Sequence, residues 1–345
     1  MINNSKKWMI YGANGYSGEL IAKKAKELDL TPIVAGRKAD AITQIASELG
    51  FEARVFDLSD SVTIQKQLED VDVVIHCAGP FSKTAKPMID ACLKSKTHYL
   101  DITGEISVFE LAKSYDQQAK QTGIVLCPGV GFDVIPTDCL ASQLKQLMPD
   151  ATHLSLGFDS KSGFSPGTAK TSVEGLSQGG KVRKDGKIIS VPLAYKTRKI
   201  DFGNGEKLAM TIPWGDVSTA HFTTNIPNIE VYIPASPRLV GRLKKMNYIR
   251  PLLGLGFVQN FMKKRIEKTV KGPNEEQRAK LKTYLWGEVK NAKGEVKELR
   301  LVTSNGYTLT VDGGLLMVNK ALETSKSGYF TPSTLVDNNL LDQLN

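Results

Sequence analysis

The sequence has few of the residues that build disulfide scaffolds or metal sites. Its 345 residues include four cysteines and four histidines, and no two cysteines form a CxxC pair. We therefore expect reduced, mostly buried cysteines in a reducing compartment, and no bound metal. No Ser/His/Asp or Cys/His arrangement stands out, and His76, inside an apolar run, is interpreted as a core histidine.

Long apolar runs are also absent, because no segment of about 18 apolar residues occurs. We expect no membrane-spanning helix, and no signal peptide either, since a predicted strand begins at residue 8. No interleaved aromatic and basic residues suggest nucleic-acid binding. With 41% apolar and 23% charged residues, the composition indicates a globular, cytoplasmic protein with one large or two medium domains.

Three glycines at a spacing of three follow the apolar run 8–11 and precede a helical pattern at 19–28. This context is typical of a dinucleotide-binding motif, here GxxGxxG rather than GxGxxG. The glycines permit a sharp turn, close approach of a pyrophosphate and close packing of the helix, whose first amides hold the phosphate charge. The alternative is a glycine turn in an ordinary α/β unit. The predicted cofactor-binding residues here are Gly12, Asn14, Gly15, Tyr16, Ser17 and Gly18.

The end of the second predicted strand, 33–35, indicates which dinucleotide is bound. NAD-binding folds place an acidic residue about 20 residues beyond the glycines, on the ribose 2′-hydroxyl. Here Arg37 and Lys38 occupy that place, and the first acidic residue is Asp40. A guanidinium can bind a 2′-phosphate, which a carboxylate would repel. The sequence therefore favours NADP over NAD, with a solvated loop arginine as the alternative.

The first part of the chain alternates strands with helices, which predicts a Rossmann-type, doubly wound parallel sheet. Asp57 follows the third strand and either caps the next turn or faces the adenine amine. A loop of small residues follows the fourth strand, at the sheet edge where ligands bind. This loop adds Cys77, Ala78, Gly79 and Pro80 to the predicted cofactor-binding residues. The predicted strands span residues 8–11, 33–35, 53–56, 71–77, 98–102 and 124–127.

From about residue 151 the pattern changes to that of a second, α+β domain with a mainly antiparallel sheet. Asn305-Gly306 is a hairpin signal between predicted strands 296–303 and 307–311. A final helix, 313–325, is expected to return to the first domain. We therefore predict an NADP-binding domain at 1–137, completed by 313–345, and a substrate and dimerisation domain at 138–312. Further strands are predicted at 153–159, 187–193, 207–212, 228–233 and 283–291, and a helix at 168–178.

Several motifs occur along nearly the whole chain. They are Gly12-Ala13-Asn14-Gly15-Tyr16-Ser17-Gly18, Ala35-Gly36-Arg37, Cys77-Ala78-Gly79-Pro80-Phe81, Tyr99-Leu100-Asp101-Ile102-Thr103-Gly104-Glu105, Pro128-Gly129-Val130-Gly131-Phe132-Asp133, Leu285-Trp286-Gly287-Glu288 and Gly328-Tyr329-Phe330-Thr331-Pro332. In this order they resemble the motifs of the saccharopine dehydrogenase-like oxidoreductases, most closely those of the trans-acting enoyl reductase branch. The resemblance implies a Rossmann domain, NADP use, and a second domain that carries substrate and subunit contacts, as in a homodimer.

Hydride transfer requires placement of the nicotinamide and a proton donor. Tyr307, next to a glycine, is a candidate donor, with a domain-joint aromatic as the alternative. Asp133 is a catalytic candidate or a helix cap. Asp101 and Glu105 follow a strand and either bind substrate or cap helix 107–121, and Thr168 begins a predicted helix that can receive an anionic group.

These observations predict an NADP-dependent oxidoreductase that reduces a C=C or C=N bond next to a carbonyl, on a lipid or acyl substrate. The alternative is an NADP-binding, membrane-associated scaffold or sensor without turnover. Residues 238–271 hold ten basic residues and one acidic residue, a surplus equal to the net charge of +9 of the whole chain. Such a basic amphipathic segment predicts peripheral binding to an anionic membrane, at the inner face, or an ordinary domain helix.

Overall fold

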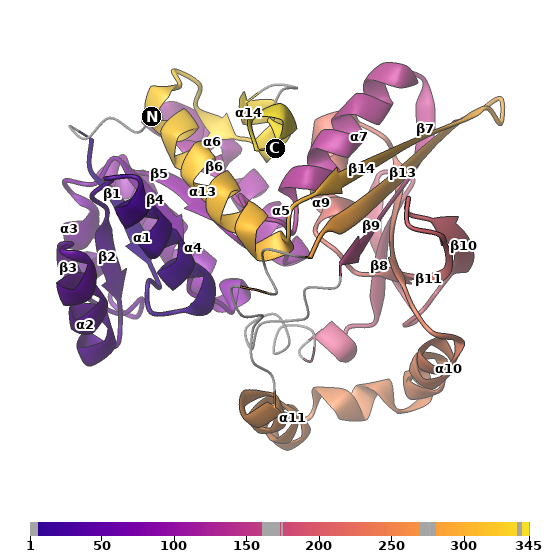
Figure 1. The fold of residues 1–345 in the computed structure, drawn as a ribbon, viewed down its shortest axis with the longest axis horizontal. Helices are drawn as coiled ribbons and strands as arrows, with labels where there is room; N and C mark the ends of the chain where they lie inside the picture. The colour runs from indigo at the N-terminus through magenta and orange to yellow at the C-terminus, as the bar shows by residue number, and fades with distance from the viewer. Residues whose placement is uncertain are drawn as a thin grey trace. The chain divides into compact units, whose positions relative to one another are not determined.

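The computed structural model describes residues 6–160, 173, 175–269, 276, 281–336 and 340–344. The chain forms two compact units (Figure 1), one from Met1–Ile135 with Tyr307–Asn345 and one from Pro136–Gly306. We call them the parallel-sheet unit and the mixed-sheet unit. No helix in the described ranges is both long enough and apolar enough to cross a membrane.

The parallel-sheet unit is built on seven strands in the order β15-β6-β5-β4-β1-β2-β3, and all the described pairs are parallel. Strand order reverses at β1, whose two neighbours are β2 and β4, so the crevice that binds dinucleotides lies at the carboxyl ends of these strands. The doubly wound fold is therefore confirmed. The strands are β1 (Trp8–Tyr11), β2 (Ile33–Gly36), β3 (Ala53–Val55), β4 (Val73–His76), β5 (His98–Asp101), β6 (Val125–Cys127) and β15 (Gly328–Tyr329).

Strands β1, β2 and β4 are buried on both faces, which is why their sequences are predominantly apolar, whereas β3 at the edge of the sheet is largely exposed. One helix predicted over 107–121 is two helices, since Tyr115 ends α5 and its hydroxyl donates to Asp90 (2.8 Å). The helices are α1 (Tyr16–Glu27), α2 (Ala39–Leu49), α3 (Ser61–Leu68), α4 (Phe81–Ser95), α5 (Ile106–Ser114), α6 (Asp116–Thr122), α13 (Gly306–Glu323), α14 (Pro332–Val336) and the 3-10 turn η2 (Leu341–Gln343).

The predicted hairpin between 296–303 and 307–311 is wrong. Strand β14 (Val296–Thr303) pairs with the preceding strand, β13 (Thr283–Asn291), and helix α13 begins at Gly306. Asn-Gly favours a hairpin turn, but Asn is equally favoured immediately before a helix, so the dipeptide alone does not separate the two outcomes. Residue Tyr307 therefore lies in the first turn of a helix and not at the end of a strand.

Two glycines let α13 pack closely within the parallel-sheet unit. A Cβ added at Gly313 would lie 2.6 Å from the Cδ1 of Ile135, and one added at Gly314 would lie 2.9 Å from the Cδ1 of Ile75 in β4. The Cδ1 of Ile21, in α1, is also within 3.6 Å of that second position. The helix thus rests on β4 and α1, the two elements that flank the predicted cofactor crevice.

The mixed-sheet unit has eight strands, with β10-β11-β12-β7-β13-β14 as the main order and β8 and β9 joined to β12. Only the described pair β7–β12 is parallel. Strands β8 and β10 were not predicted, because their sequences GKVRK and TRKID are polar and owe their extended form to pairing. The remaining strands are β7 (Ala151–Ser160), β8 (Gly180–Lys184), β9 (Lys187–Val191), β10 (Thr197–Asp201), β11 (Glu206–Ile212) and β12 (Asn228–Pro234).

Helix α7 (Ile135–Leu147) packs on this sheet where Gly287 leaves room, since a Cβ there would meet Leu144 at 2.5 Å and Leu140 at 3.1 Å. Most of the helix predicted at 168–178 lies outside the described residues. The basic stretch forms three helical segments in place of one long helix. The other helices are α9 (Asp216–Thr224), α10 (Pro237–Met246), the 3-10 segment η1 (Asn247–Gly254) and α11 (Gly256–Thr269).

We expect Gly314→Ala to lower the free energy of unfolding by about 1–3 kcal/mol, because the added methyl group overpacks the contact with Ile75. Gly241→Ala is the matched control, since Gly241 lies inside α10 with no described atom within 4 Å of its Cβ position. That substitution should stabilise by up to about 1 kcal/mol through helix propensity. Urea unfolding of both variants measures the difference, and equal effects would contradict the close packing of α13.

Candidate functional site

The glycine turn after β1 forces a close approach between two loops. Gly12 has a φ of +87°, and a Cβ there would lie 2.8 Å from the amide nitrogen of Ala78 and 2.9 Å from the carbonyl carbon of Cys77. The amides of Gly12 and Ala13 donate to the carbonyl of Ala35 (2.7 and 3.1 Å), which ties the turn to the end of β2. The ends of β1, β2 and β4 are thereby held at one point.

The start of α1 has the form of an anion-binding site. Gly15 is the N-cap residue in an extended conformation, and no side chain caps the helix. The first amides of a helix have no acceptor within it, so they and the helix dipole attract negative charge. A Cβ at Gly18 would overlap the carbonyl oxygen of Gly12, which explains the third glycine as a packing requirement. The backbone therefore fits a pyrophosphate.

Arg37 is an exposed residue directly after β2. Its charge acts on two neighbours: it opposes the increase in the pKa of the Tyr11 hydroxyl, and it lowers the pKa of Asp57. Burial is the main reason why the pKa of Tyr11 rises to about 12. The amide oxygen of Asn14 lies 3.2 Å from the Cβ position of Gly36, over the same strand end. A 2′-phosphate at this edge would meet a guanidinium.

Of two other predicted positions at this edge, Asp57 has a structural partner and Lys38 has none among the described side chains. Asp57 accepts hydrogen bonds from the amide and hydroxyl of Ser59 (2.7 and 2.5 Å), and these bonds are the main reason why its pKa is lowered. The carboxylate thus holds the turn after β3, which was one of its two predicted roles. Lys38 is exposed and is the N-cap residue of α2, without a side-chain cap.

The loop after β4 is fixed by hydrogen bonds from both sides. The amide of Cys77 donates to the carbonyl of Tyr11 (2.7 Å), and the hydroxyl of Thr84 donates to the carbonyl of Ala78 (2.7 Å). Burial raises the pKa of the Cys77 thiol, so this cysteine is not a reactive thiolate. Thr84 also contacts the Nε2 of the buried His76 (2.9 Å), which agrees with a core histidine.

Glu105 caps α4 rather than α5. Its two carboxylate oxygens accept the amides of Phe81 (2.8 Å) and Ser82 (2.9 Å), the first residues of α4. Asp101 is fully buried and accepts hydrogen bonds from the Tyr99 hydroxyl (2.6 Å) and from the amides of Thr103 and Gly129 (2.9 Å each). Burial raises the pKa of Asp101 to about 6. These contacts are structural, and substrate binding by either carboxylate stays a prediction.

The two catalytic candidates lie at the same end of the parallel-sheet unit. The ring of Tyr307, in the first turn of α13, packs edge-on against that of Tyr16, the first residue of α1, with centroids 4.9 Å apart. One turn further along α13, the hydroxyl of Thr310 accepts the amide of Phe132 (3.0 Å), which neighbours Asp133. The structure thus brings Tyr307 beside the helix start that fits the pyrophosphate.

Asp133 is partly buried, and its Oδ2 lies 2.7 Å from the Cβ position of Gly104. Only a glycine at position 104 leaves room for this carboxyl. Desolvation by the surrounding atoms raises the pKa of Asp133 to about 7, so the group exchanges a proton near neutral pH. The last predicted site residue, Thr168, lies outside the described residues.

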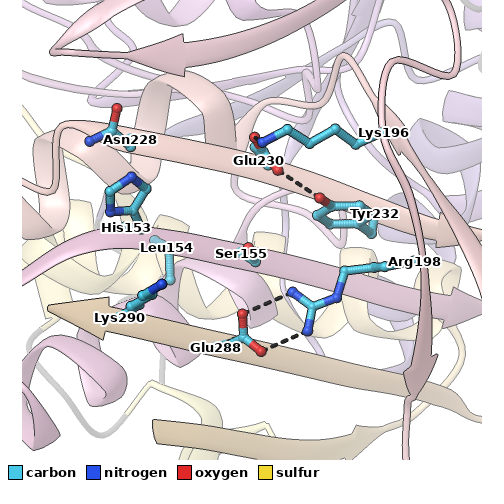
Figure 2. Close-up of a pocket in the computed structure, with 10 residues that line it drawn as sticks. All are labelled: His153, Leu154, Ser155, Lys196, Arg198, Asn228, Glu230, Tyr232, Glu288 and Lys290. Atoms are coloured by element: carbon cyan, nitrogen blue, oxygen red, sulfur yellow. Dashed lines mark hydrogen bonds and ion pairs between the residues drawn. The ribbon is translucent and has the colours of Figure 1, made fainter. Parts of the chain in front are cut away.

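The mixed-sheet unit has a separate pocket of about 250 Å³ that no sequence pattern indicated (Figure 2). Its charged side chains mostly neutralise each other, because Arg198 binds Glu288 through two hydrogen bonds (2.8 and 2.7 Å) and Lys196 pairs with Glu230. The residues that line it are His153, Leu154, Ser155, Lys196, Arg198, Asn228, Glu230, Tyr232, Glu288 and Lys290. Neither in this pocket nor elsewhere in the described ranges does a cluster of His, Cys, Asp and Glu occur that could hold a metal.

The uncapped start of α1, the close glycine turn and the guanidinium after β2 define a dinucleotide-binding Rossmann unit suited to a 2′-phosphate. Residues 8–127 match the family model described as the saccharopine dehydrogenase NADP binding domain. This part of the chain is therefore similar to that NADP-binding domain, and the predicted resemblance to saccharopine dehydrogenase-like oxidoreductases and the predicted cofactor are confirmed.

Curated relatives agree over part of their length. The chain is 27% identical over 200 residues to a probable mitochondrial saccharopine dehydrogenase-like oxidoreductase of Arabidopsis thaliana, covering 51% of this chain and 44% of the relative. It is 31% identical over 144 residues to the trans-acting enoyl reductase of Mycobacterium bovis, covering 39% of this chain and 34% of that protein. The chain thus matches less than half the length of these relatives.

Solved structures show the same fold over nearly the whole chain. Saccharopine dehydrogenase (L-Glu forming) from Saccharomyces cerevisiae has a TM-score of 0.66 at 12% identity and covers 98% of this chain and 97% of that one. The homospermidine synthase of Legionella pneumophila, solved in complex with NAD, has a TM-score of 0.64 at 10% identity, covering 98% and 89%. At these identities the similarity establishes the fold alone.

We expect Arg37→Ala to weaken NADPH binding about ten- to a hundredfold, because a charge-assisted contact contributes roughly 1.5–3 kcal/mol. NADH affinity should change little, since NADH lacks the 2′-phosphate. Fluorescence titration with both cofactors measures the change, with Lys94→Ala, an exposed lysine in the last turn of α4, as the control. Equal affinities of the wild-type protein for NADPH and NADH would exclude this role of Arg37.

The raised pKa of Asp133 predicts that the free energy of unfolding depends on pH. Its pKa of about 7 exceeds the ordinary 3.8, so the folded state binds the proton more tightly. This contribution is fully present below about pH 4 and is lost as the pH rises to about 7, at about 1.4 kcal/mol for each pKa unit. Wild type should therefore lose stability relative to Asp133→Asn between pH 4 and 7. Urea unfolding across this range checks it, with Asp40→Asn at an exposed aspartate as control; a constant difference would refute it.

Proposed function

We propose that the protein is an NADP-dependent oxidoreductase that transfers a hydride to a C=C or C=N bond next to a carbonyl. The NADP-binding domain supports the cofactor, and relatives named trans-acting enoyl reductase and saccharopine dehydrogenase-like oxidoreductase support the class of reaction. The observation that carries the proposal is the position of Tyr307, which packs on Tyr16 at the start of α1.

Bound NADPH would supply the hydride, and the chain has to bind it and deliver a proton. The glycine turn and the start of α1 would hold the pyrophosphate, and Arg37 would hold the 2′-phosphate. The phenol of Tyr307 donates a hydrogen bond or a proton to the atom that becomes negative as the double bond is reduced. Asp133, whose pKa is about 7, retains a proton near neutral pH and is a second donor at the same end of the unit.

We propose further that the substrate is an acyl or lipid molecule. Two observations support this. The mycobacterial relatives are named trans-acting enoyl reductases, and the large apolar side chains of Phe257 and Phe261 are exposed. Substrate contacts of Asp101, Glu105 and Thr168, and the homodimer implied by the family resemblance, stay predictions.

The test is NADPH oxidation with two panels of acceptors, α,β-unsaturated acyl thioesters and pairs of an amine with an α-keto acid. We expect turnover with one panel, and a decrease in kcat of about 10²–10⁴-fold in Tyr307→Phe if the phenol is the proton donor. NADPH affinity should stay unchanged in this variant. Tyr195→Phe, at an exposed tyrosine of the mixed-sheet unit, is the control.

Two results would contradict the proposal. If the wild-type protein binds NADPH tightly and oxidises it with neither panel, the protein is better described as an NADP-binding scaffold or sensor. If Tyr307→Phe retains full activity, Tyr307 is not the donor, and the same measurement on Asp133→Asn decides whether the carboxyl supplies the proton.

A further inference from the structure

The helical segments of the basic stretch, α10, η1 and α11, contact the rest of the mixed-sheet unit through only one of their sides. In α10, the buried Val240 packs with Ala194 and Met210, and Leu243 lies against the same cluster. The apolar side of this helix is therefore part of the core, as in an ordinary domain helix. For α10, the alternative of an ordinary domain helix is therefore the one that the packing supports.

The two segments that follow are anchored by polar contacts on their inner side. The side chain of Asn247 in η1 accepts the amide of Leu193 (2.8 Å) and donates to its carbonyl (3.2 Å). The side chain of Gln259 in α11 donates to the carbonyls of Leu253 (2.6 Å) and Val173 (3.2 Å). Leu253 is buried. These contacts set which side of η1 and α11 faces outward.

The outward side carries an unusual concentration of large apolar residues, which we call the outer patch. Exposure ranges from 42% for Leu255 to 89% for Tyr248. Single exposed apolar residues are normal on soluble proteins, but a group of aromatic and aliphatic side chains within one short segment marks an interaction site. The patch consists of Tyr248, Ile249, Leu252, Leu255, Phe257 and Phe261.

Basic side chains surround the outer patch on both sides along the chain. All are exposed, and none forms an ion pair or hydrogen bond through its side chain with another described residue. The stretch 238–271 contains one acidic residue, Glu267, against ten basic residues, so the positive charge is not balanced locally. The exposed basic residues are Arg238, Arg242, Lys244, Lys245, Lys264 and Arg265.

We propose that the outer patch and its basic surround dock the protein on the surface of an anionic lipid bilayer. Aromatic and aliphatic side chains that insert into the headgroup region, flanked by Lys and Arg that bind anionic lipids, are the two components of peripheral membrane binding. The helices lie in the interface and do not span it, since no described helix is long and apolar enough to cross.

Charge complementarity favours a lipid surface over a second copy of this chain. A twofold interface places the same surface of both copies together, so the basic residues around each patch would face those of the other. An anionic bilayer supplies the opposite charge to all of them at once. This inference does not depend on the proposed reaction, because the outer patch contains no predicted cofactor or catalytic residue.

The experiment is sedimentation of the full chain with phosphatidylcholine vesicles that contain or lack phosphatidylserine, at low and high salt. We expect binding to the anionic vesicles at low salt, and much weaker binding at high salt or without phosphatidylserine. Lys244→Gln with Lys245→Gln should weaken binding about 25-fold, since each basic residue near an anionic surface contributes about a fivefold factor. Phe257→Ser with Phe261→Ser should weaken it at least about tenfold.

The matched control is Val62→Ser with Lys66→Gln in α3, where Val62 is 72% exposed, against 73% for Phe257. This variant should bind vesicles as the wild type does, and urea unfolding together with NADPH titration confirms that all variants are folded. The proposal is overturned if the wild-type protein stays in the supernatant with anionic vesicles at low salt, or if the control loses binding equally. Light scattering gives a further test. If the wild-type protein is a dimer and the variant Phe257→Ser with Phe261→Ser is a monomer, the outer patch binds a second copy of the chain and the proposal is also overturned.

Discussion

The close contact between the loops after β1 and β4 is the constraint on which the nucleotide site depends. Only a residue without a side chain fits at position 12, because a Cβ there would collide with the backbone of Cys77 and Ala78. This contact sets where α1 begins, so it also sets the direction of the uncapped amides. The C-terminal helix α13 rests on the same β4 and α1 elements, and the position of Tyr307 follows from that packing.

Local patterns in the sequence were enough to predict the nucleotide-binding half of the molecule. The glycine spacing, the apolar strands and Arg37 each act over a few residues, and all lie where the motif places them. Tyr307 was predicted to lie at a strand end and lies in a helix, because Asn305-Gly306 suits a hairpin and a helix start equally. Its contact with Tyr16 joins opposite ends of the chain, and no local pattern contains that information.

Other features follow from tertiary structure alone. Strand β8 is rich in lysine and arginine, and it becomes a strand through its pairing with β9 and β12. In α11 the structure exposes Phe257 and Phe261 and partly buries Val258. Which side of a short helix faces outward depends on anchors such as Gln259, whose partners are set by the fold.

Glu105 has a consequence for where anions can bind. Its carboxylate neutralises the positive end of α4, and Asp60 does the same for α3 by accepting the amides of Val62 and Thr63. In the helices that follow β1 and β2, no side chain accepts the first amides, although Glu19 and Asp40 lie in their first turns. Two of four neighbouring helix starts are thus closed to a negatively charged group. The two starts that stay open follow the strands that end at the glycine turn and at Arg37, so the acidic caps leave this one edge of the sheet to the negative charges of a dinucleotide.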